Sequence, residues 1–262
     1  MSFHVLRFNR AASRYEPEAG IQLRMAGKLL ELWKGPVPGS ILELGCGTGL
    51  LTRRLCERFP SASILATDAA QAMLVEARKR CGDGGGGRLV FTELDARGNV
   101  PAAKEVISAS PFNTVCSNAL VQWFPNLETH LRFVSKLSAA DGAYLLSGFT
   151  HSNFPELNEL LSEPPFSYRD FPGHDSEEVE QASGNAGWKV SVLYTWEEKE
   201  ILPSAREVLR RIQTLGSSRD PHSGGRLNRK NLEWLISEYS RRFSEGGGVR
   251  LTWKPWIALL RR

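Results

Sequence analysis

The feature that most constrains the fold of this chain is a run of alternating glycines, Gly45, Gly47 and Gly49, directly after a short apolar segment. The apolar segment predicts a buried strand over residues 40–45, and the glycines predict a tight loop at its end. Glycine is needed where the backbone turns sharply and approaches a ligand without a Cβ in the way. A helix is predicted over residues 50–59, and the free N–H groups of its first turn suit a polar or anionic ligand group.

The spacing of these glycines distinguishes two classes of ligand. A dinucleotide-binding loop has the spacing G-x-G-x-x-G, whereas this loop has G-x-G-x-G and carries Leu50 where the third glycine belongs. Glu43 stands at the end of the predicted strand. The departure in spacing together with this acidic residue favours S-adenosylmethionine over NAD.

Acidic residues also follow the next two predicted strands. Asp68 ends the second strand, where its carboxylate can accept hydrogen bonds from both ribose hydroxyls of an adenosyl group. Asp95 follows the third strand, where it can accept from the adenine amino group while the Ala96 N–H donates to a ring nitrogen. Met73, one turn into the next helix, can cover the adenine face. The predicted cofactor-binding residues are Glu43, Gly45, Cys46, Gly47, Asp68, Ala69, Met73, Asp95, Ala96 and Asn118.

Strands and helices are predicted to alternate along the chain. The strands cover residues 40–45, 63–68, 89–92, 114–117, 143–149, 189–198 and 249–260. The main helices cover residues 8–34, 50–59, 69–80, 127–137, 176–186, 204–215 and 228–243. This alternation predicts an α/β fold with a seven-stranded, mainly parallel, Rossmann-like sheet and helices on both faces. Ligands of such sheets bind at the carboxyl ends of the strands.

We expect one domain over residues 1–262, with two additions to the sheet. Residues 1–34 are predicted to form an N-terminal helical cap. Residues 206–245 are predicted to form a helical insertion between the last two strands, lying over the crevice as a lid. Pro255 falls within the last predicted strand, where a proline indicates an edge or a bulge.

Composition argues against several classes of protein. No apolar run approaches the length of about 18 residues that a membrane-spanning helix needs, and the N-terminus lacks a signal-peptide core, so we expect a cytoplasmic protein. The cysteines lack C-x-x-C spacing and the histidines show no paired spacing, so neither disulfides nor a metal site is expected. His151, just beyond the fifth strand, is the histidine expected nearest to the crevice.

Charge is distributed unevenly along the second half of the chain. Residues 204–262 hold 13 Lys and Arg against 5 Asp and Glu, whereas residues 151–203 hold 3 against 11. The basic segment predicts an anionic partner, and a solvated helical surface is the alternative. Nucleic acid is disfavoured as that partner because acidic residues such as Glu233 and Glu238 share helices with the basic ones.

Residues 35–150 resemble the class I S-adenosylmethionine-dependent methyltransferases. The glycine loop and the acidic residue after the second strand carry this resemblance. In that family the loop approaches the methionine part of the cofactor, and the acidic residue holds the ribose. The resemblance implies that these roles fall on Gly45, Gly47 and Asp68.

Three further segments resemble the malonyl-acyl-carrier-protein O-methyltransferases of biotin synthesis, over nearly the whole chain. These are Phe8–Glu16 before the fold, with Ala19 and Gln22 downstream, Ser117–Trp123 with the pattern S-N-x-x-x-Q-W after the fourth strand, and the basic helices from Arg206 onward. The glycine-rich stretch 82–87 and the run Trp253–Trp256 depart from the family. The resemblance implies methyl transfer to the free carboxylate of malonyl-acyl carrier protein, an early step of pimeloyl and biotin synthesis, and we expect a monomer that binds neither nucleic acid nor membrane.

The expected chemistry is positioning rather than proton transfer. A carboxylate acceptor is already ionised at neutral pH and needs no general base. Tyr15, Gln122 and Trp123 are predicted to position the reacting groups, and no metal is expected. Malonyl recognition or carrier docking is predicted for Arg14, Arg206, Arg210 and Arg211, because a guanidinium pairs bidentately with a carboxylate.

Two alternatives remain open from the sequence. The first is a methyltransferase of the same fold that acts on a small-molecule carboxylate or carbon acid. The second is a non-catalytic protein that binds S-adenosylmethionine.

Overall fold

The computed structural model describes residues 3–15, 18–82, 87–97, 106, 108, 110–164, 166, 171–215 and 228–262. Within the first helix, the side chains of residues 3, 4, 7, 11, 13 and 14 lie outside this description. In the described part of the chain, no helix combines the length and the apolar character needed to cross a membrane.

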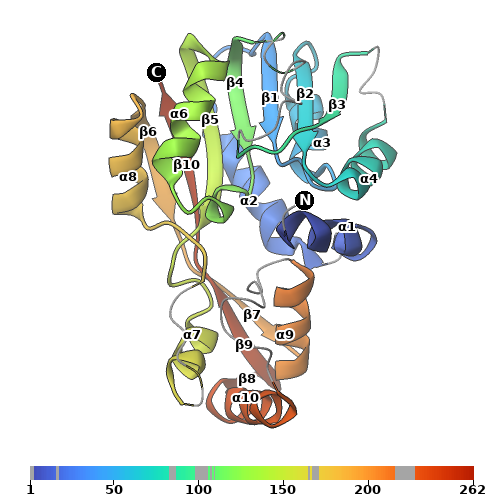
Figure 1. Cartoon of the computed structure of the whole chain (residues 1–262), viewed down its shortest axis with the longest axis vertical. Coiled ribbons are helices and arrows are strands. Elements are labelled where there is room, and N and C mark those ends of the chain that lie inside the picture. Colours follow the sequence, from blue (N-terminus) through green and yellow to red (C-terminus); the bar gives the residue numbers. More distant parts are fainter. Residues whose placement is uncertain are drawn as a thin grey trace.

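A seven-stranded sheet forms the upper body of the molecule in Figure 1. Its order is β3-β2-β1-β4-β5-β10-β6, and all the pairs from β3 to β5 are parallel, whereas β10 runs antiparallel to β5 and to β6. The strands are β1 (Ser40–Leu44), β2 (Ser63–Asp68), β3 (Leu89–Glu93), β4 (Phe112–Ser117), β5 (Ser138–Phe149), β6 (Lys189–Thr195) and β10 (Pro255–Arg261). The mainly parallel, seven-stranded sheet predicted from the alternation of elements is confirmed.

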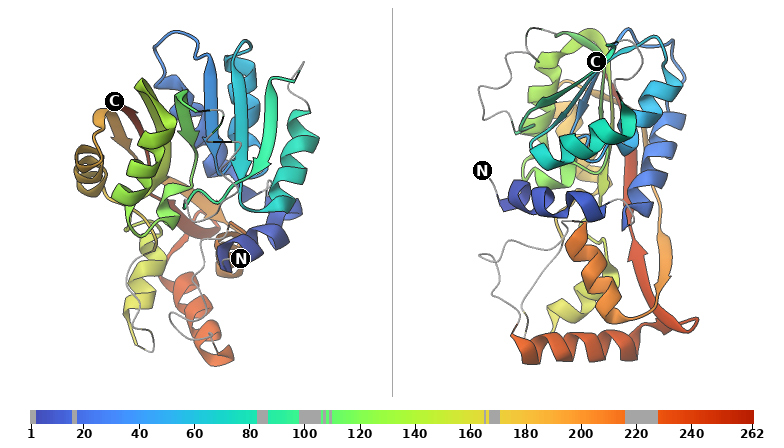
Figure 2. Two further views of the ribbon diagram at one scale, coloured as in Figure 1. Left: turned by 45° about the horizontal axis from the view of Figure 1, so that its top comes forward. Right: turned by 90° about the vertical axis from the view of Figure 1, so that its right-hand side faces the viewer.

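Helices cover both faces of this sheet (Figure 2). One layer consists of α2 (Gly20–Glu31), α3 (Leu50–Arg58) and α4 (Gln71–Cys81), whose buried side chains share a core cluster with β1, β2 and β5. The other layer consists of α6 (Leu127–Leu137) and α8 (Ser176–Asn185). The apolar spacing of α6 places Leu127, Leu131 and Val134 on the sheet, and the Asn126 side chain caps the helix by accepting from the Thr129 N–H at 2.8 Å.

The first helix, α1 (Phe3–Tyr15), lies at the carboxyl ends of the strands (Figure 1). It packs on α4 and touches α9 (Ala205–Thr214). The single helix expected over residues 8–34 is therefore two helices, α1 and α2, because the chain turns between them.

A second, smaller sheet forms the lower body in Figure 1, and we call it and its helices the accessory unit. Its antiparallel strands β7 (Glu198–Leu202), β9 (Gly248–Trp253) and β8 (Ser244–Glu245) pair in that order. The unit also contains α7 (Pro155–Ser162), α9 and α10 (Arg229–Arg242). The sequence pattern indicates a helical insertion between the last two strands of the main sheet. The structure instead places the strands β7, β8 and β9 there, together with α9 and α10.

Two strand boundaries differ from expectation for one reason. The segments 189–198 and 249–260 were each expected to be one strand, but each divides between the two sheets. Pro255 is the first residue of β10, where the chain passes from the accessory sheet to the main sheet. Hydrophobic periodicity continues across such a junction, so it does not reveal where a strand changes its partner.

The fifth strand is also longer than expected. β5 begins at Ser138, five residues before the start expected from the sequence, so the turn-forming residues Asp141 and Gly142 lie within it. Ser138 pairs with Phe112, and the register shifts before Thr114 pairs with Ala143. An irregularity of this kind absorbs the turn-forming residues inside a strand.

Candidate functional site: the cleft at the strand ends

The glycine loop after β1 adopts backbone conformations that require glycine. Gly45 and Gly47 have φ angles of +66° and +55°. A Cβ on Gly45 would lie 2.7 Å from Leu120 Cδ1, so this position is closed to any other residue without rearrangement. The Cys46 N–H donates to Thr67 O at 2.8 Å and fixes the loop to β2.

Asp68, the last residue of β2, holds the loop in place. One carboxylate oxygen accepts from the Gly47 N–H and the other from the Ala70 N–H, each at 2.8 Å. Burial raises the pKa of Asp68 to about 6, against the lowering effect of these N–H donors. The carboxylate therefore joins the ends of two neighbouring strands and gives the cleft a fixed acceptor.

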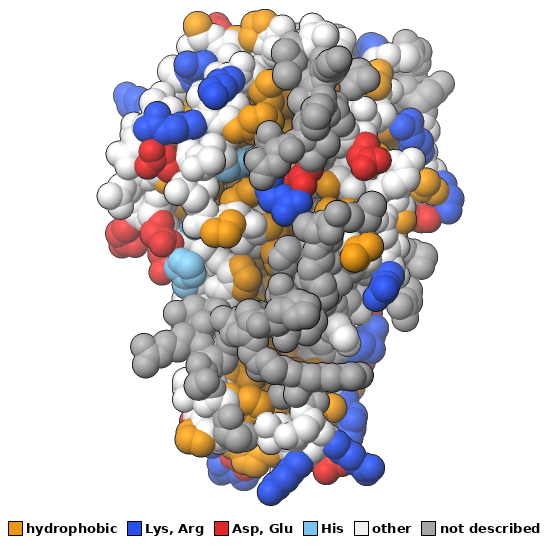
Figure 3. Space-filling view, viewed as in Figure 1, with side chains coloured by type: hydrophobic (Ala, Val, Ile, Leu, Met, Phe, Trp, Pro, Cys, Tyr) orange, Lys and Arg blue, Asp and Glu red, His pale blue; other side chains and the backbone are white. Residues whose placement is uncertain are grey.

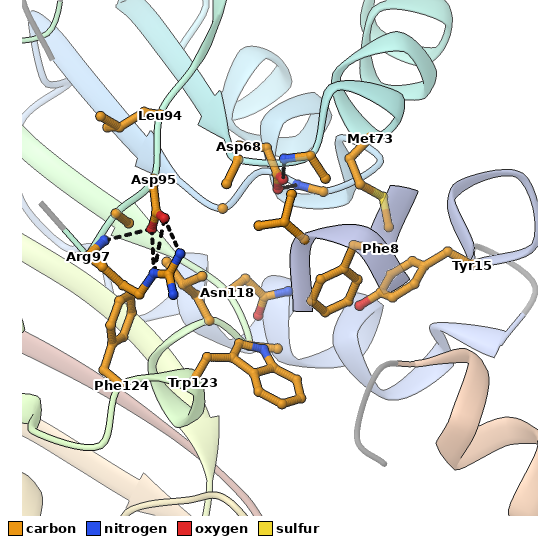
Figure 4. A pocket seen from close by; sticks show the side chains of 18 residues that line it. Phe8, Tyr15, Asp68, Met73, Leu94, Asp95, Arg97, Asn118, Trp123 and Phe124 are labelled. Carbon is orange, nitrogen blue, oxygen red and sulfur yellow. Dashed lines mark hydrogen bonds and ion pairs between the residues drawn. The ribbon is translucent and has the colours of Figure 1, made fainter. Parts of the chain in front are cut away.

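The loop opens onto a cleft with about 830 Å³ of non-protein space (Figure 4). Its wall comes from α1, the glycine loop and the ends of β2, β3 and β4. The structure brings ten of the predicted site residues to this wall: Tyr15, Gly45, Gly47, Asp68, Ala69, Met73, Asp95, Ala96, Asn118 and Trp123.

One side of the cleft is aromatic. Phe8 stands between Tyr15 and Trp123, with edge contacts at centroid separations of 6.3 and 5.9 Å. The Tyr15 hydroxyl points into the cleft in Figure 4. Burial and the charge of Asp68 raise the pKa of Tyr15, so the hydroxyl stays protonated and can donate a hydrogen bond.

Asp95 carries a partner that the sequence analysis did not anticipate. Its carboxylate accepts from Arg97 Nε at 2.8 and 3.0 Å and also contacts the Arg97 guanidinium terminus (Figure 4). The Arg97 hydrogen bonds lower the pKa of Asp95, which keeps it ionised. Both residues line the cleft, so Asp95 faces a ligand as half of an ion pair.

A smaller cavity adjoins the cleft beneath the glycine loop. It is lined by Glu43 and Cys46, which do not line the main cleft, and by Gln22 of α2. Glu43 is buried and accepts from Thr52 Oγ1 at 2.6 Å, and burial raises its pKa to about 8. Burial also holds the pKa of the Cys46 thiol well above its usual range, so Cys46 stays protonated.

Gln22 presents an unpaired acceptor to this cavity. Its side chain is only 4% exposed, and its Oε1 has no hydrogen-bond partner among the described residues. A buried amide oxygen without a donor is unfavourable by about 1–3 kcal/mol, which a donating ligand would remove. Gln22 belongs to the N-terminal segment that resembles the family, but no ligand-binding role was predicted for it; the further signal is a polar residue on the buried face of α2, between Ile21 and Met25.

Asn118 joins α2 to the end of β4. Its Nδ2 donates to Gln22 O at 2.9 Å, and its Oδ1 accepts from Ser147 Oγ at 2.8 Å. The next residue, Ala119, has a φ of +53°, and its N–H donates to Ser147 Oγ at 3.0 Å. Asn118 therefore shapes the backbone between the main cleft and the smaller cavity, both of which it lines.

Several residues that were predicted to position or bind the methyl acceptor lie away from the cleft wall. Gln122 turns back, and its Nε2 donates to Ala119 O at 2.6 Å. Arg206 is exposed on α9, and the side chain of Arg14 lies outside the described residues. Arg210 and Arg211 both bind the buried Glu18, at 2.6 and 3.0 Å.

The hydrogen-bond acceptors and the apolar wall of the cleft and the smaller cavity fit an adenosyl cofactor that carries positive charge. A fixed carboxylate at Asp68 suits ribose hydroxyls, and Met73 and the aromatic wall suit an adenine face. The unpaired Gln22 Oε1 and the neighbouring Glu43 suit an ammonium group. These observations agree with the carboxylate and backbone chemistry of an S-adenosylmethionine site.

The comparisons with known proteins agree with this site. Residues 41–142 match the family model of a methyltransferase domain. The Bacillus subtilis YcgJ protein has a similar fold, with a TM-score of 0.60 at 12% identity over 91% of this chain and 98% of that one. A Haemonchus contortus phosphoethanolamine N-methyltransferase 2, solved with S-adenosyl-L-methionine, has a TM-score of 0.55 at 15% identity, covering 95% of this chain and 56% of that one. The fold and the loop with its carboxylate define the chain as a class I methyltransferase.

Full-length relatives narrow that class. A malonyl-[acyl-carrier protein] O-methyltransferase of Chlorobium phaeovibrioides is 30% identical over 98% of this chain and 94% of its own length. The protein of the same name from Geobacter sulfurreducens is 29% identical over 94% of this chain and 93% of its own length. This chain belongs to the malonyl-[acyl-carrier protein] O-methyltransferase family.

Proposed function

We propose that the chain transfers the methyl group of S-adenosylmethionine to the free carboxylate of malonyl-acyl carrier protein. The observation that carries this proposal is the similarity to relatives of that name over 98% of the chain, which extends through the accessory unit. The cofactor part of the fold alone would support methyl transfer to many acceptors. Similarity beyond it favours a shared acceptor.

The residues of the cleft and of the adjoining cavity would bind different parts of the methyl donor. Asp68 would accept from the ribose hydroxyls, and Met73 with the Ala96 N–H would bind the adenine. Gln22 Oε1 and Glu43 would face the ammonium group of the methionine part, next to the glycine loop. S-adenosylmethionine supplies an electrophilic methyl carbon bonded to a sulfonium.

The acceptor side would need positioning and exclusion of water. A malonyl carboxylate is ionised at neutral pH, so no side chain has to remove a proton. Phe8, Tyr15 and Trp123 form an apolar wall, from which the Tyr15 hydroxyl would donate a hydrogen bond to the acceptor. Such a wall holds the reacting atoms in line and keeps water out, which accounts for a large part of the rate gain in reactions of this kind.

Carrier docking is proposed for the exposed cations of the accessory unit and not for its paired ones. On the face drawn in Figure 3, Lys and Arg side chains at the lower end are interspersed with Asp and Glu. Arg211 binds Glu18 at 3.0 Å and Glu200 at 2.6 Å, so its charge is already balanced. Arg206 is exposed and remains the predicted contact of choice for an acidic carrier. We propose that the accessory unit acts as the lid over the acceptor.

The test uses purified chain, methyl-labelled S-adenosylmethionine and malonyl-acyl carrier protein. We expect label in the carrier as a base-labile methyl ester. Free malonate and a malonyl thioester of a small thiol serve as comparison acceptors. Absence of an ester on the carrier under conditions where the chain binds the donor would contradict the proposal.

Arg210 and Arg211 of α9 form ion pairs within the chain, and this favours one second candidate function, the methylation of small carboxylates. If Glu18 and Glu200 neutralise the basic helix, a carrier has fewer cations to contact. Arg206→Glu separates the two readings, because it should raise the KM for the carrier substrate and leave that for a small thioester unchanged. Equal turnover of both acceptors by the wild type and by this variant would favour the small-molecule reading.

A further inference from the structure

Two histidines and a glutamate from separate segments meet on the surface beyond the end of β5. His151 follows β5, His174 precedes α8, and Glu178 lies in the first turn of α8. One ligand atom from each residue lies within 4.8 Å of the others. We propose that these three side chains form a binding site for a divalent transition metal ion of the Zn²⁺ class, separate from the methyl-transfer cleft.

The separations between the donor atoms suit a tetrahedral ion. Glu178 Oε2 lies 2.9 Å from His151 Nε2 and 3.9 Å from His174 Nδ1. Ligand bonds of about 2.0–2.2 Å at a tetrahedral Zn²⁺ put neighbouring donor atoms about 3.3–3.5 Å apart. Each glutamate–histidine pair therefore needs to move by well under 1 Å to enclose the ion. The two histidine donor atoms lie within 4.8 Å of each other and need to approach by up to about 1.5 Å, within the reach of side-chain torsions.

The buried histidine is already held in the form that binds metal. His174 Nε2 lies 3.2 Å from Val121 O, an acceptor, so Nε2 carries the proton and the Nδ1 lone pair faces Glu178. A backbone carbonyl that accepts from the second ring nitrogen is the usual outer support of a metal-binding histidine.

The other two ligands leave room for the ion and for water. The side chains of His151 and Glu178 are 39% and 51% exposed, so the fourth coordination position faces solvent. When the ion binds, it takes the place of the hydrogen bond between His151 Nε2 and Glu178, and the neutral ring carries its proton on Nδ1 so that the Nε2 lone pair faces the ion. The Asp175 N–H donates to Glu178 at 2.9 Å and keeps the carboxylate at the start of the helix.

The position of the site links it to the acceptor side of the cleft. Val121 begins the 3₁₀ turn Val121–Trp123, and Trp123 lines the cleft. His174 supports that turn, because its Nε2 lies 3.2 Å from Val121 O. An ion bound at the cluster would therefore link the end of β5 and the start of α8 to the turn. The histidines lie in different segments, so their spacing in the sequence gave no sign of this arrangement.

The experiment titrates the chelator-treated full-length chain with Zn²⁺ alone, by calorimetry and by thermal unfolding. We expect one equivalent to bind and the unfolding midpoint to rise with Zn²⁺ concentration. His151→Asn and Glu178→Gln should each weaken binding by at least about 10-fold. Glu178→Gln is informative because glutamine at this position preserves the capping box of α8.

Glu177→Gln, on the same first turn, is the matched control and should bind Zn²⁺ like the wild type. Unchanged affinity in both ligand variants would overturn the proposal. Binding that is lost on alkylation of the cysteines would overturn it as well, because the ion would then be held by thiolates. Co²⁺ in place of Zn²⁺ gives a third measurement, since its visible spectrum should indicate nitrogen and oxygen ligands and change in His151→Asn.

Discussion

The cofactor cleft and the accessory unit use charged residues in opposite ways. In the cleft, the Asp68 carboxylate is bound only by backbone N–H groups and remains available to a ligand. In the accessory unit, acidic residues of the segment 151–203 pair with basic residues of the segment 204–262, as Glu156 does with Arg250 at 2.8 Å and Glu163 with Arg242 at 2.5 Å. The Asp68 carboxylate is therefore open to a ligand although the cleft also holds the paired Asp95, whereas the high charge density of the accessory unit is largely spent on internal pairs.

The largest effect is expected from adding a methyl group to the glycine loop. Gly45→Ala places a Cβ 2.7 Å from Leu120 at a φ of +66°, and overpacking and backbone strain together should lower the free energy of unfolding by about 3 kcal/mol. Binding of S-adenosylmethionine should be lost. Denaturant unfolding and calorimetry measure the two quantities.

Gly246→Ala is the control for this change in the accessory unit. Gly246 also has a positive φ, +58°, but no atom lies within 4 Å of its Cβ position. It should lose about 1 kcal/mol of stability and no cofactor affinity. Equal effects at the two glycines would show that the cleft is no more constrained than the accessory turn.

The next effect tests the fixed carboxylate. Asp68→Asn replaces one of two acceptors with an NH₂ group that opposes a backbone N–H, so the loop loses a support and the ribose loses its acceptor. We expect cofactor affinity to fall by about 100-fold, or about 2.7 kcal/mol. Asp141→Asn, at an exposed site in β5, should leave it unchanged.

The third prediction concerns pH and the small cavity. The pKa of Glu43 is raised to about 8 in the folded chain. Between the ordinary pKa of a glutamate, which applies in the unfolded chain, and pH 8, the folded chain therefore keeps a proton that the unfolded chain releases. Stability of the ligand-free chain should therefore fall as pH rises from about 6.5 to 8, by at most about 1.4 kcal/mol per pH unit. Glu43→Gln should remove this slope in urea unfolding.

Glu57→Gln, at an exposed position on α3, is the control and should keep the slope of the wild type. The pH window begins above the pKa of Asp68, about 6, so that carboxyl contributes less to the change than Glu43 does. A slope that persists in Glu43→Gln would assign the titration to another group.

The smallest effect is expected in the ion pairs of the accessory unit. Arg211→Gln leaves Glu18 and Glu200 without this partner, and because all three side chains are mostly buried we expect a loss of about 1 kcal/mol. Arg206→Gln, exposed on the same helix, should change stability by less than about 0.5 kcal/mol. Thermal unfolding of the two variants gives the comparison, and a larger loss at Arg206 would contradict it.

The sequence predicted the parts of the molecule that depend on local order. The glycine loop, Asp68 and Met73 follow from strand ends and helix starts, and the structure brings them together because parallel strands end at one edge. No site role was predicted for Gln22 or Arg97, because their roles depend on which atoms face them across the fold. The arginines of α9 were interpreted as a docking surface for the same reason, since composition does not show that Glu18 lies beside them.

The route of the chain between the two sheets has an evolutionary consequence. β6 and β10 are neighbours in the main sheet, and the chain leaves it after β6 for the accessory unit and re-enters at β10, at Pro255. Residues can therefore be gained, lost or exchanged in most of the accessory unit without altering the register of the strands that carry the glycine loop and Asp68. Choice of acceptor can diversify within such a lineage while the means of holding the methyl donor is inherited unchanged.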